Sequence, residues 1–234
     1  GGRGAVAEEA GGERAFMEGL PWCFVGCCAA GLVVLAVFLR TASILVPIWR
    51  GSPVHRIRTS SAIRTMVVLG SGGHTTEMLH LIQGLSADRY APIAYVLGGS
   101  DKTSLAKLAA FPDFRKDGEF HRIPRAREVG QSWVSSVGTT AASIIAAFSV
   151  VWRARPQLVI CNGPGICVTV SLAAFILRCL GFLDCRILFC ESWCRVERLS
   201  LSGKIMYLYA DRFIVHWEDL QKRHPRAEFH GNLY

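Results

Sequence analysis

The sequence lacks the cysteine patterns that predict a metal site or a disulfide framework. It has nine cysteines, but none forms the paired CxxC motifs of a zinc site, and most lie in apolar segments. We therefore expect small buried side chains in a reducing compartment, and no metal or other cofactor. The glycine-rich turn Gly70–His74 also lacks the lysine of a P-loop, which excludes that motif, and lacks the glycine spacing typical of NAD binding.

Acidic residues are scarce as well. The chain has 18 Asp and Glu against 26 Lys and Arg, so its formal net charge is +8. This balance suits nucleic acid, anionic lipid head groups or phosphorylated ligands, and it does not decide among them. The apolar share of 51% is high for a soluble domain and indicates contact with a membrane.

Charged residues are absent from the segment Leu20–Leu39. About twenty apolar residues span a bilayer as a helix, so we predict a transmembrane anchor over residues 20–48, after a disordered lead at residues 1–19. Four arginines and no acid follow between residues 50 and 64, which predicts a single-pass chain with a cytosolic C-terminal domain. A cleaved signal peptide is the alternative. We expect four side chains to hold the anchor: Leu20, Trp22, Leu39 and Trp49.

Residues 62–234 alternate short apolar runs with helical segments. Strands are predicted at 66–70, 90–97, 120–123, 157–161, 186–190 and 212–216. This α/β pattern is typical of a single Rossmann-like parallel sheet with functional loops at the carboxyl ends of its strands. Such a sheet often binds its ligand across a crevice shared with a second domain. The sequence shows only one domain, so we expect a partner chain to complete the site.

A long uncharged helix is predicted from Trp133 to Trp152. Its length would allow a second membrane span. Six serines and threonines make it less apolar than the first span, and a second span would interrupt the alternation of strands and helices. We therefore expect a buried or membrane-surface helix.

The turn GSGGH lies at the first strand-to-helix junction. Glycine lets backbone N–H groups approach an anion at the positive end of a helix dipole. Gly72, Gly73 and Thr75 are therefore candidate anion-binding residues, and His74 is a candidate proton acceptor or phosphate ligand. The alternative is a tight turn with a structural histidine that caps the helix.

Two later strand ends also carry polar residues. The NGPG turn supplies the candidate binding residues Asn162, Gly163 and Gly165. After the next strand, Glu191 is a candidate catalytic base or sugar ligand, and Arg195 is able to pair with a phosphate. The alternatives are an ordinary turn and a Glu–Arg pair that caps the next helix.

The segment HRIPRAREVGQSW places Arg125 and Arg127 near Trp133. Arginine with tryptophan suits a membrane interface or a diphosphate head group. A solvated basic loop is the ordinary alternative.

Five segments together resemble the asparagine-linked glycosylation protein fourteen family. They are VVLGSGGHTTEML, HRIPRAREVGQSW, LVICNGPGICV, ESWCRVERLSLSGKIMYLYADRFIVHW and FHGNLY. They occur in order and cover nearly all of residues 64–234. This family is the membrane-anchored subunit of the transferase that adds the second N-acetylglucosamine to dolichol-diphosphate-N-acetylglucosamine. It is similar to the N-terminal half of a bacterial GT-B glycosyltransferase that also acts on a lipid-linked acceptor.

The resemblance implies inverting transfer from UDP-N-acetylglucosamine on the cytosolic face of the endoplasmic reticulum membrane. The donor would bind to a separate soluble chain of the protein thirteen type, so this chain alone would be inactive. Gly72, Gly73, His74 and Glu191 would face the acceptor, and no nucleic acid is expected. The C-terminal tail would dock the partner through Gly231, Asn232, Leu233 and Tyr234. A purely structural membrane scaffold is the alternative function, followed by an oxidoreductase that would use Asp101.

Overall fold

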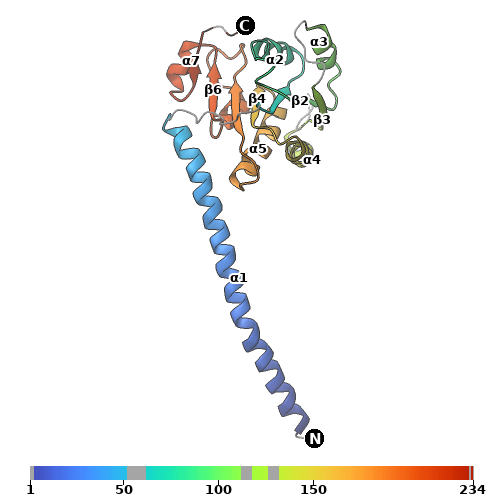
Figure 1. Ribbon diagram of the computed structural model, residues 1–234, viewed down its shortest axis with the longest axis vertical. Coiled ribbons are helices and arrows are strands. Elements are labelled where there is room, and N and C mark those ends of the chain that lie inside the picture. The colour runs from blue at the N-terminus through green and yellow to red at the C-terminus, as the bar shows by residue number, and fades with distance from the viewer. Residues whose placement is uncertain (1–2, 52–61, 112–117, 126–131, 232, 234) are drawn as a thin grey trace. The chain divides into compact units, whose positions relative to one another are not determined.

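The computed structural model describes residues 3–51, 62–111, 118–125, 132–231 and 233. Side chains are described from Val25 onward, apart from those at positions 133–135. The chain forms two compact units, Gly1–Ser43 and Ile44–Tyr234 (Figure 1).

The first unit belongs to the helix α1, which runs over Arg3–Trp49. Its segment Val25–Trp49 has a mean hydropathy of 2.2 and is long and apolar enough to cross a membrane. Leu39 is exposed within it, and the side chains of Leu20 and Trp22 lie outside the described part. Residues 3–19, which the sequence predicted to be a disordered lead, are helical in the structure. This segment is rich in alanine and glutamate, which are strong helix formers.

The second unit is built on one parallel sheet, which confirms the predicted fold class. Its order is β3-β2-β1-β4-β5-β6-β7, and every described pair of neighbours is parallel. The continuous apolar runs suit strands that are covered on both faces. The strands are β1 Thr65–Leu69, β2 Ile93–Gly98, β3 Glu119–Ile123, β4 Leu158–Asn162, β5 Arg186–Cys190, β6 Arg212–Val215 and β7 Glu228–Phe229.

Helices cover both faces of this sheet, as expected for a doubly wound fold. Alternate side chains of β1 separate into two cores: Val67 packs with α2 and α3, and Val68 packs with α4 and α5. The helices are α2 Gly73–Gln83, α3 Ser104–Ala110, α4 Trp133–Ala154, α5 Gly165–Cys179, α6 Leu201–Met206 and α7 Glu218–Arg223.

Helix α4 extends two residues beyond its predicted end at Trp152. Ser143, Ala147 and Val151 are buried on one face, where the hydroxyl of Ser143 donates to Thr169 of α5 over 3.2 Å. Ile145 is exposed on another face. The segment Ser136–Ala154 is also long and apolar enough to cross a membrane, with a mean hydropathy of 1.4. Its packing on α5 supports a helix that covers the sheet.

A buried ion pair joins α5 to the strands beside it. The guanidinium of Arg178 donates to both carboxylate oxygens of Asp211, over 3.0 and 2.8 Å. Asp211 also accepts a hydrogen bond from the backbone N–H of Ile187 in β5. One carboxylate therefore ties a helix and two strands together.

The described cysteines have free thiols. Cys161, Cys167, Cys179, Cys185 and Cys190 are buried, as the sequence analysis expected. Burial raises the pKa of the Cys185 thiol, which keeps it protonated. The expectation of burial was wrong for Cys194, which is exposed, while Cys27 and Cys28 are exposed on the apolar segment of α1.

Candidate functional site

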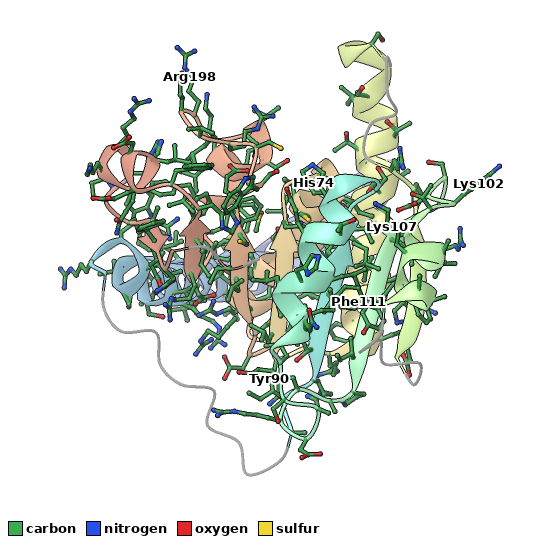
Figure 2. All side chains as sticks on the ribbon, turned by 90° about the horizontal axis from the view of Figure 1, so that it is seen from above. His74, Tyr90, Lys102, Lys107, Phe111 and Arg198 are labelled. Carbon is green, nitrogen blue, oxygen red and sulfur yellow. The ribbon has the colours of Figure 1, made fainter. Side chains whose placement is uncertain are left out.

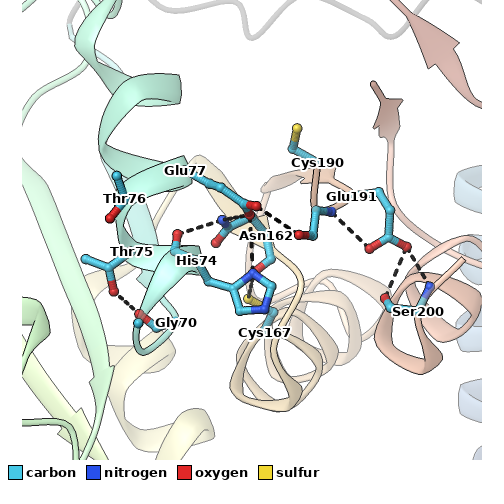
Figure 3. Close-up of polar contacts among 12 residues, drawn as sticks. Gly70, His74, Thr75, Thr76, Glu77, Asn162, Cys167, Cys190, Glu191 and Ser200 are labelled. Carbon is cyan, nitrogen blue, oxygen red and sulfur yellow. Dashed lines mark hydrogen bonds and ion pairs between the residues drawn. The ribbon is translucent and has the colours of Figure 1, made fainter. Parts of the chain in front are cut away.

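The turns after β1 and β4 touch each other at the carboxyl edge of the sheet. A Cβ atom at Gly70 would lie 2.5 Å from Cγ of Pro164 and 2.7 Å from Cβ of His74. Only glycine at this position lets the two turns approach so closely. The register of the sheet thus brings the GSGGH and NGPG motifs into one site (Figure 3).

Each turn leads directly into the N-terminus of a helix, α2 after the first turn and α5 after the second. Gly72, with φ +67°, is the N-cap residue of α2, and Pro164 is that of α5. Neither N-terminus has a hydrogen bond from a capping side chain among the described residues. Their first backbone N–H groups are therefore available to an anion.

His74 lies between the two turns. Its imidazole ring covers Gly163, where an added Cβ would lie 2.6 Å from the ring atom Cε1. Gly163 also has φ +72°, a conformation that favours glycine. The His74 side chain is about one-third exposed, and its Nδ1 lies 3.3 Å from Oε2 of Glu77. Figure 2 shows this histidine at the start of α2, with Lys107 of α3 nearby.

Glu77 is a candidate site residue that the sequence analysis missed. Its Oε1 accepts a hydrogen bond of 2.9 Å from the hydroxyl of Ser192, in the loop after β5. Burial acts to raise the pKa of Glu77, but hydrogen bonds from His74, Ser192 and the Trp193 backbone hold that pKa below its usual value. The spacing of three residues from His74 places both side chains on one helix face, and this signal was present in the sequence.

Asn162 joins the same cluster from the end of β4. Its Nδ2 donates to the backbone carbonyl of His74 over 2.8 Å and lies 3.4 Å from Oε2 of Glu77. Its Oδ1 is buried and has no hydrogen-bond partner among the described residues. Asn162 therefore links the start of α2 to the end of β4 through its amide nitrogen.

Glu191 follows β5 as predicted, but its side chain turns into the protein (Figure 3). It is fully buried, and it accepts hydrogen bonds from the backbone N–H groups of Ser192 and Ser200 over 3.0 and 2.9 Å. A Cβ at Gly203 would overlap its Oε2. This geometry supports a structural role at the start of α6. Arg195, the other candidate in this loop, is exposed.

Thr75 and Asp101 also have structural roles, because both form hydrogen bonds with neighbouring protein groups. The Thr75 hydroxyl is buried, donates to the carbonyl of Gly70, and lies 2.6 Å from Oγ of Ser104. Asp101 accepts hydrogen bonds from the backbone N–H groups of Thr103 and Ser104, so it caps α3. That carboxylate is already engaged by the protein, which argues against the oxidoreductase alternative.

A cavity of about 760 Å³ adjoins the two turns. Ser71, Arg125 and Gly165 line it at the strand ends, and α4 and α6 supply apolar walls. A Cβ at Gly98 would lie 3.1 Å from Cγ of Arg125, so the arginine side chain packs over the end of β2. The structure therefore brings Arg125 to the site, whereas Arg127 lies outside the described residues.

Comparison with known proteins decides the family. The model of the family described as "Oligosaccharide biosynthesis protein Alg14 like" matches residues 65–233. The chain belongs to the Alg14 family. It is 41% identical over 215 residues to the mouse UDP-N-acetylglucosamine transferase subunit ALG14, covering 88% of this chain and 95% of that one. The human subunit is 40% identical and the Yarrowia lipolytica subunit 41%, each over 88% of this chain. This Alg14 family chain is thus a subunit of a UDP-N-acetylglucosamine transferase.

A solved epimerase structure shows the fold that this Alg14 family member shares with it. A UDP-N-acetylglucosamine 2-epimerase aligns with 70% of this chain and 46% of its own, at a TM-score of 0.51 and 16% identity. MurG of Acinetobacter baumannii aligns with 67% of this chain and 41% of its own, at a TM-score of 0.48 and 14% identity. The likeness to the epimerase concerns the fold alone, which is that of one half of a GT-B molecule.

Two of the predicted docking residues of this Alg14 family chain, Gly231 and Leu233, are described and follow the edge strand β7 in the sequence. Gly231 has φ +76°, and Leu233 is described, while Asn232 and Tyr234 lie outside the described residues. Next to them, Glu228 pairs with Arg212 of β6 and with His230, the latter over 3.0 Å. Docking of a partner by residues 231–234 stays a prediction.

Proposed function

We propose that this chain is the membrane-anchoring, acceptor-binding subunit of the transferase that adds the second N-acetylglucosamine to dolichol-diphosphate-N-acetylglucosamine. The reaction would take place on the cytosolic face of the endoplasmic reticulum. Support comes from relatives that are named transferase subunits and from one arrangement in the structure. Two helix N-termini without side-chain caps open side by side next to a cavity that Arg125 lines.

The diphosphate of the acceptor would bind at these N-termini. Each supplies backbone N–H groups and the positive end of a helix dipole, which stabilises a nearby anion by about 0.3–1 kcal/mol at an exposed site and more when partly buried. Gly72, Gly73 and Gly165 keep this surface free of bulky side chains, and Gly163 leaves room for the imidazole ring of His74. The guanidinium of Arg125 would add a charge-assisted hydrogen bond to a phosphate oxygen.

His74 would be the general base, with Glu77 as its positioning residue. A hydrogen bond from Nδ1–H to Glu77 leaves Nε2 as a proton acceptor. As the acceptor 4-hydroxyl oxygen bonds to the anomeric carbon, its proton passes to Nε2. The bond from that carbon to UDP breaks, and UDP leaves with the electron pair. Base catalysis of this kind contributes roughly 10²–10⁴-fold.

The remaining candidates would position the residues around the acceptor sugar. Asn162 would act indirectly, because its Nδ2 donates a hydrogen bond to the backbone carbonyl of His74 and so positions the proposed base. Glu191 would act indirectly, because it holds the loop that carries Ser192 against Glu77.

Donor binding would be the task of a soluble partner of the protein thirteen type, docked through residues 231–234. The term "subunit" in the names of the relatives implies such a partner. Helix α1 would hold the pair at the membrane that contains the lipid acceptor, which raises the effective concentration without new contacts. A purely structural scaffold is the second candidate function.

The decisive experiment replaces two histidines of the same helix. The full chain and its donor-binding partner are reconstituted in vesicles with a dolichol-type diphosphate-N-acetylglucosamine acceptor, and transfer from UDP-N-acetylglucosamine is measured. His74→Ala should lower the rate at least about 100-fold, as expected for loss of a general base. His80→Ala, an exposed position on α2, should leave it unchanged. A scaffold would tolerate both substitutions as long as the complex assembles.

A further inference from the structure

The cavity beside the glycine turns is larger than a diphosphate and a sugar hydroxyl require. Its volume of about 760 Å³ lies in the range of sites that enclose a drug-sized molecule. It extends from the strand ends between the first half of α4, the first turns of α5, and α6. The chemistry proposed for His74 takes place beside this cavity, because His74 is not among the described residues that line it.

The far walls of the cavity are apolar. Val137, Ala141 and Ile144 line it from α4 at helical spacing, and Leu201 and Ile205 line it from α6. Val137 is 70% exposed and Leu201 is 61% exposed, although both are large apolar side chains. The cavity therefore has an apolar rim that remains open in the described residues.

The end near the strands has the opposite character. Ser71, Arg125 and Gly165 lie there, next to the N-termini of α2 and α5. The acid at this end, Asp101, is engaged by the backbone of α3. One continuous cavity thus joins a surface for an anion to a surface for an apolar chain.

This combination selects one class of occupant. A helix of another protein would fill the apolar walls but leave the anion-binding end without a ligand. A soluble sugar phosphate would do the reverse. An amphiphile with an anionic head and a long apolar chain satisfies both ends.

We propose that this cavity binds the first isoprenoid units of the acceptor lipid, directly behind its diphosphate. The inference rests on the proposed acceptor-binding function and adds a second contact to it. Part of the lipid chain would leave the bilayer and bind between α4 and α6, with Val137 and Leu201 at the entrance. The diphosphate would then be held from both sides, by the helix N-termini and by the attached chain.

A photoreactive acceptor tests this directly on the unmodified complex. The probe is an isoprenyl diphosphate-N-acetylglucosamine that carries a diazirine in its second isoprene unit, added to the full chain and its partner in vesicles. We expect labelled peptides from residues 136–144 and 201–205, and loss of labelling when unlabelled acceptor is added. Labelling confined to α1 or to lipid would overturn the inference.

Two neighbouring alanines of α4 give a matched pair of variants. Ala141 lines the cavity, whereas Ala142 is exposed on α4 and is not part of the lining. Ala141→Trp should raise KM for the isoprenoid acceptor about tenfold or more, the effect of losing a methylene or more of apolar contact. Its KM for UDP-N-acetylglucosamine should not change, and Ala142→Trp should resemble the parent.

A short acceptor separates this inference from the proposed function. With a diphosphate-N-acetylglucosamine that carries only a short alkyl chain, Ala141→Trp should work as well as the parent. Equal loss with both acceptors, or no loss with either, overturns the lipid cavity and leaves acceptor binding at His74 in place. If His74→Ala also retains full transfer, the proposed function itself is wrong.

Discussion

The side-chain amide of Asn162 donates a hydrogen bond of 2.8 Å to the backbone carbonyl of His74. This contact joins residues 88 positions apart and fixes the first turn of α2 against the end of β4. The same amide lies 3.4 Å from Glu77, so one donor orients both members of the proposed catalytic pair.

Asn162→Asp tests this contact with a side chain of nearly the same size. It removes the donor and sets a carboxylate against the His74 carbonyl and the Glu77 carboxylate, so we expect about 1–3 kcal/mol of lost stability and slower transfer. Urea unfolding of the detergent-solubilised chain and the vesicle assay measure the two effects. If the free energy of unfolding and the transfer rate both equal those of the parent, the Asn162 amide does not position His74 and Glu77.

Glu77→Gln should lower kcat roughly tenfold to hundredfold, because a neutral amide orients and stabilises His74 less well as it takes up a proton. KM for the acceptor should change little. Glu218→Gln provides the control, since Glu218 is an exposed residue of α7 that pairs with Lys222. Equal rates for the two variants would exclude Glu77 from the mechanism.

The lowered pKa of Glu77 also predicts how the stability of this variant depends on pH. A carboxyl whose folded pKa is depressed contributes stability above its unfolded pKa, and this contribution is lost as the pH falls through the folded pKa. Glu77→Gln should therefore be less stable than the parent at pH 7, and the gap should shrink below about pH 4.5. Paired urea titrations at several pH values measure that gap. A gap that stays constant on acidification contradicts the prediction.

Glu191→Ala should lower the stability of the folded chain, and any loss of transfer should follow from that loss of stability. It leaves the backbone N–H groups of Ser192 and Ser200 without their acceptor, which costs roughly 1–3 kcal/mol for each buried donor. We expect a lower Tm, with KM for UDP-N-acetylglucosamine unchanged in the folded fraction. If Tm is unchanged and transfer is abolished, Glu191 has the catalytic role that the sequence suggested.

Gly163→Ala should reduce both stability and transfer. The left-handed backbone costs a non-glycine residue about 1–2 kcal/mol, and the new methyl group would displace the His74 ring. Gly138→Ala in α4 is the control, because nothing lies within 4 Å of its Cβ position and alanine favours a helix. The prediction fails if thermal unfolding and transfer cannot distinguish the two variants.

The fold was largely predictable because it depends on patterns that act over short distances. Apolar runs indicated β1, β4 and β5 to within a residue or two, and glycine-rich turns marked the ends of β1 and β4. The short elements α7 and β7 were missed, since six and two residues carry too little periodicity to stand out.

The site was only partly predictable. The position of Glu191 after a strand end was correct, but the direction of its side chain depends on Ser200 and Gly203, which a strand pattern does not reveal. Glu77 was missed because the GSGGH motif ends at His74, and Glu77 lies one helical turn farther along α2. The contact between Glu77 and Ser192 spans 115 positions and depends on the order of the strands.

The final turn of the first helix has a practical consequence. The indole N–H of Trp49 donates to the carbonyl of Leu208 over 3.1 Å, its ring meets Tyr207 edge-on, and Arg226 lies over it. Residues 44–49 therefore belong to the folded body that begins at Ile44. A shortened chain for work without detergent should begin at Ile44. A chain that begins at residue 50 would lack Trp49, and Tyr207 and Arg226 would lose their contacts with its ring.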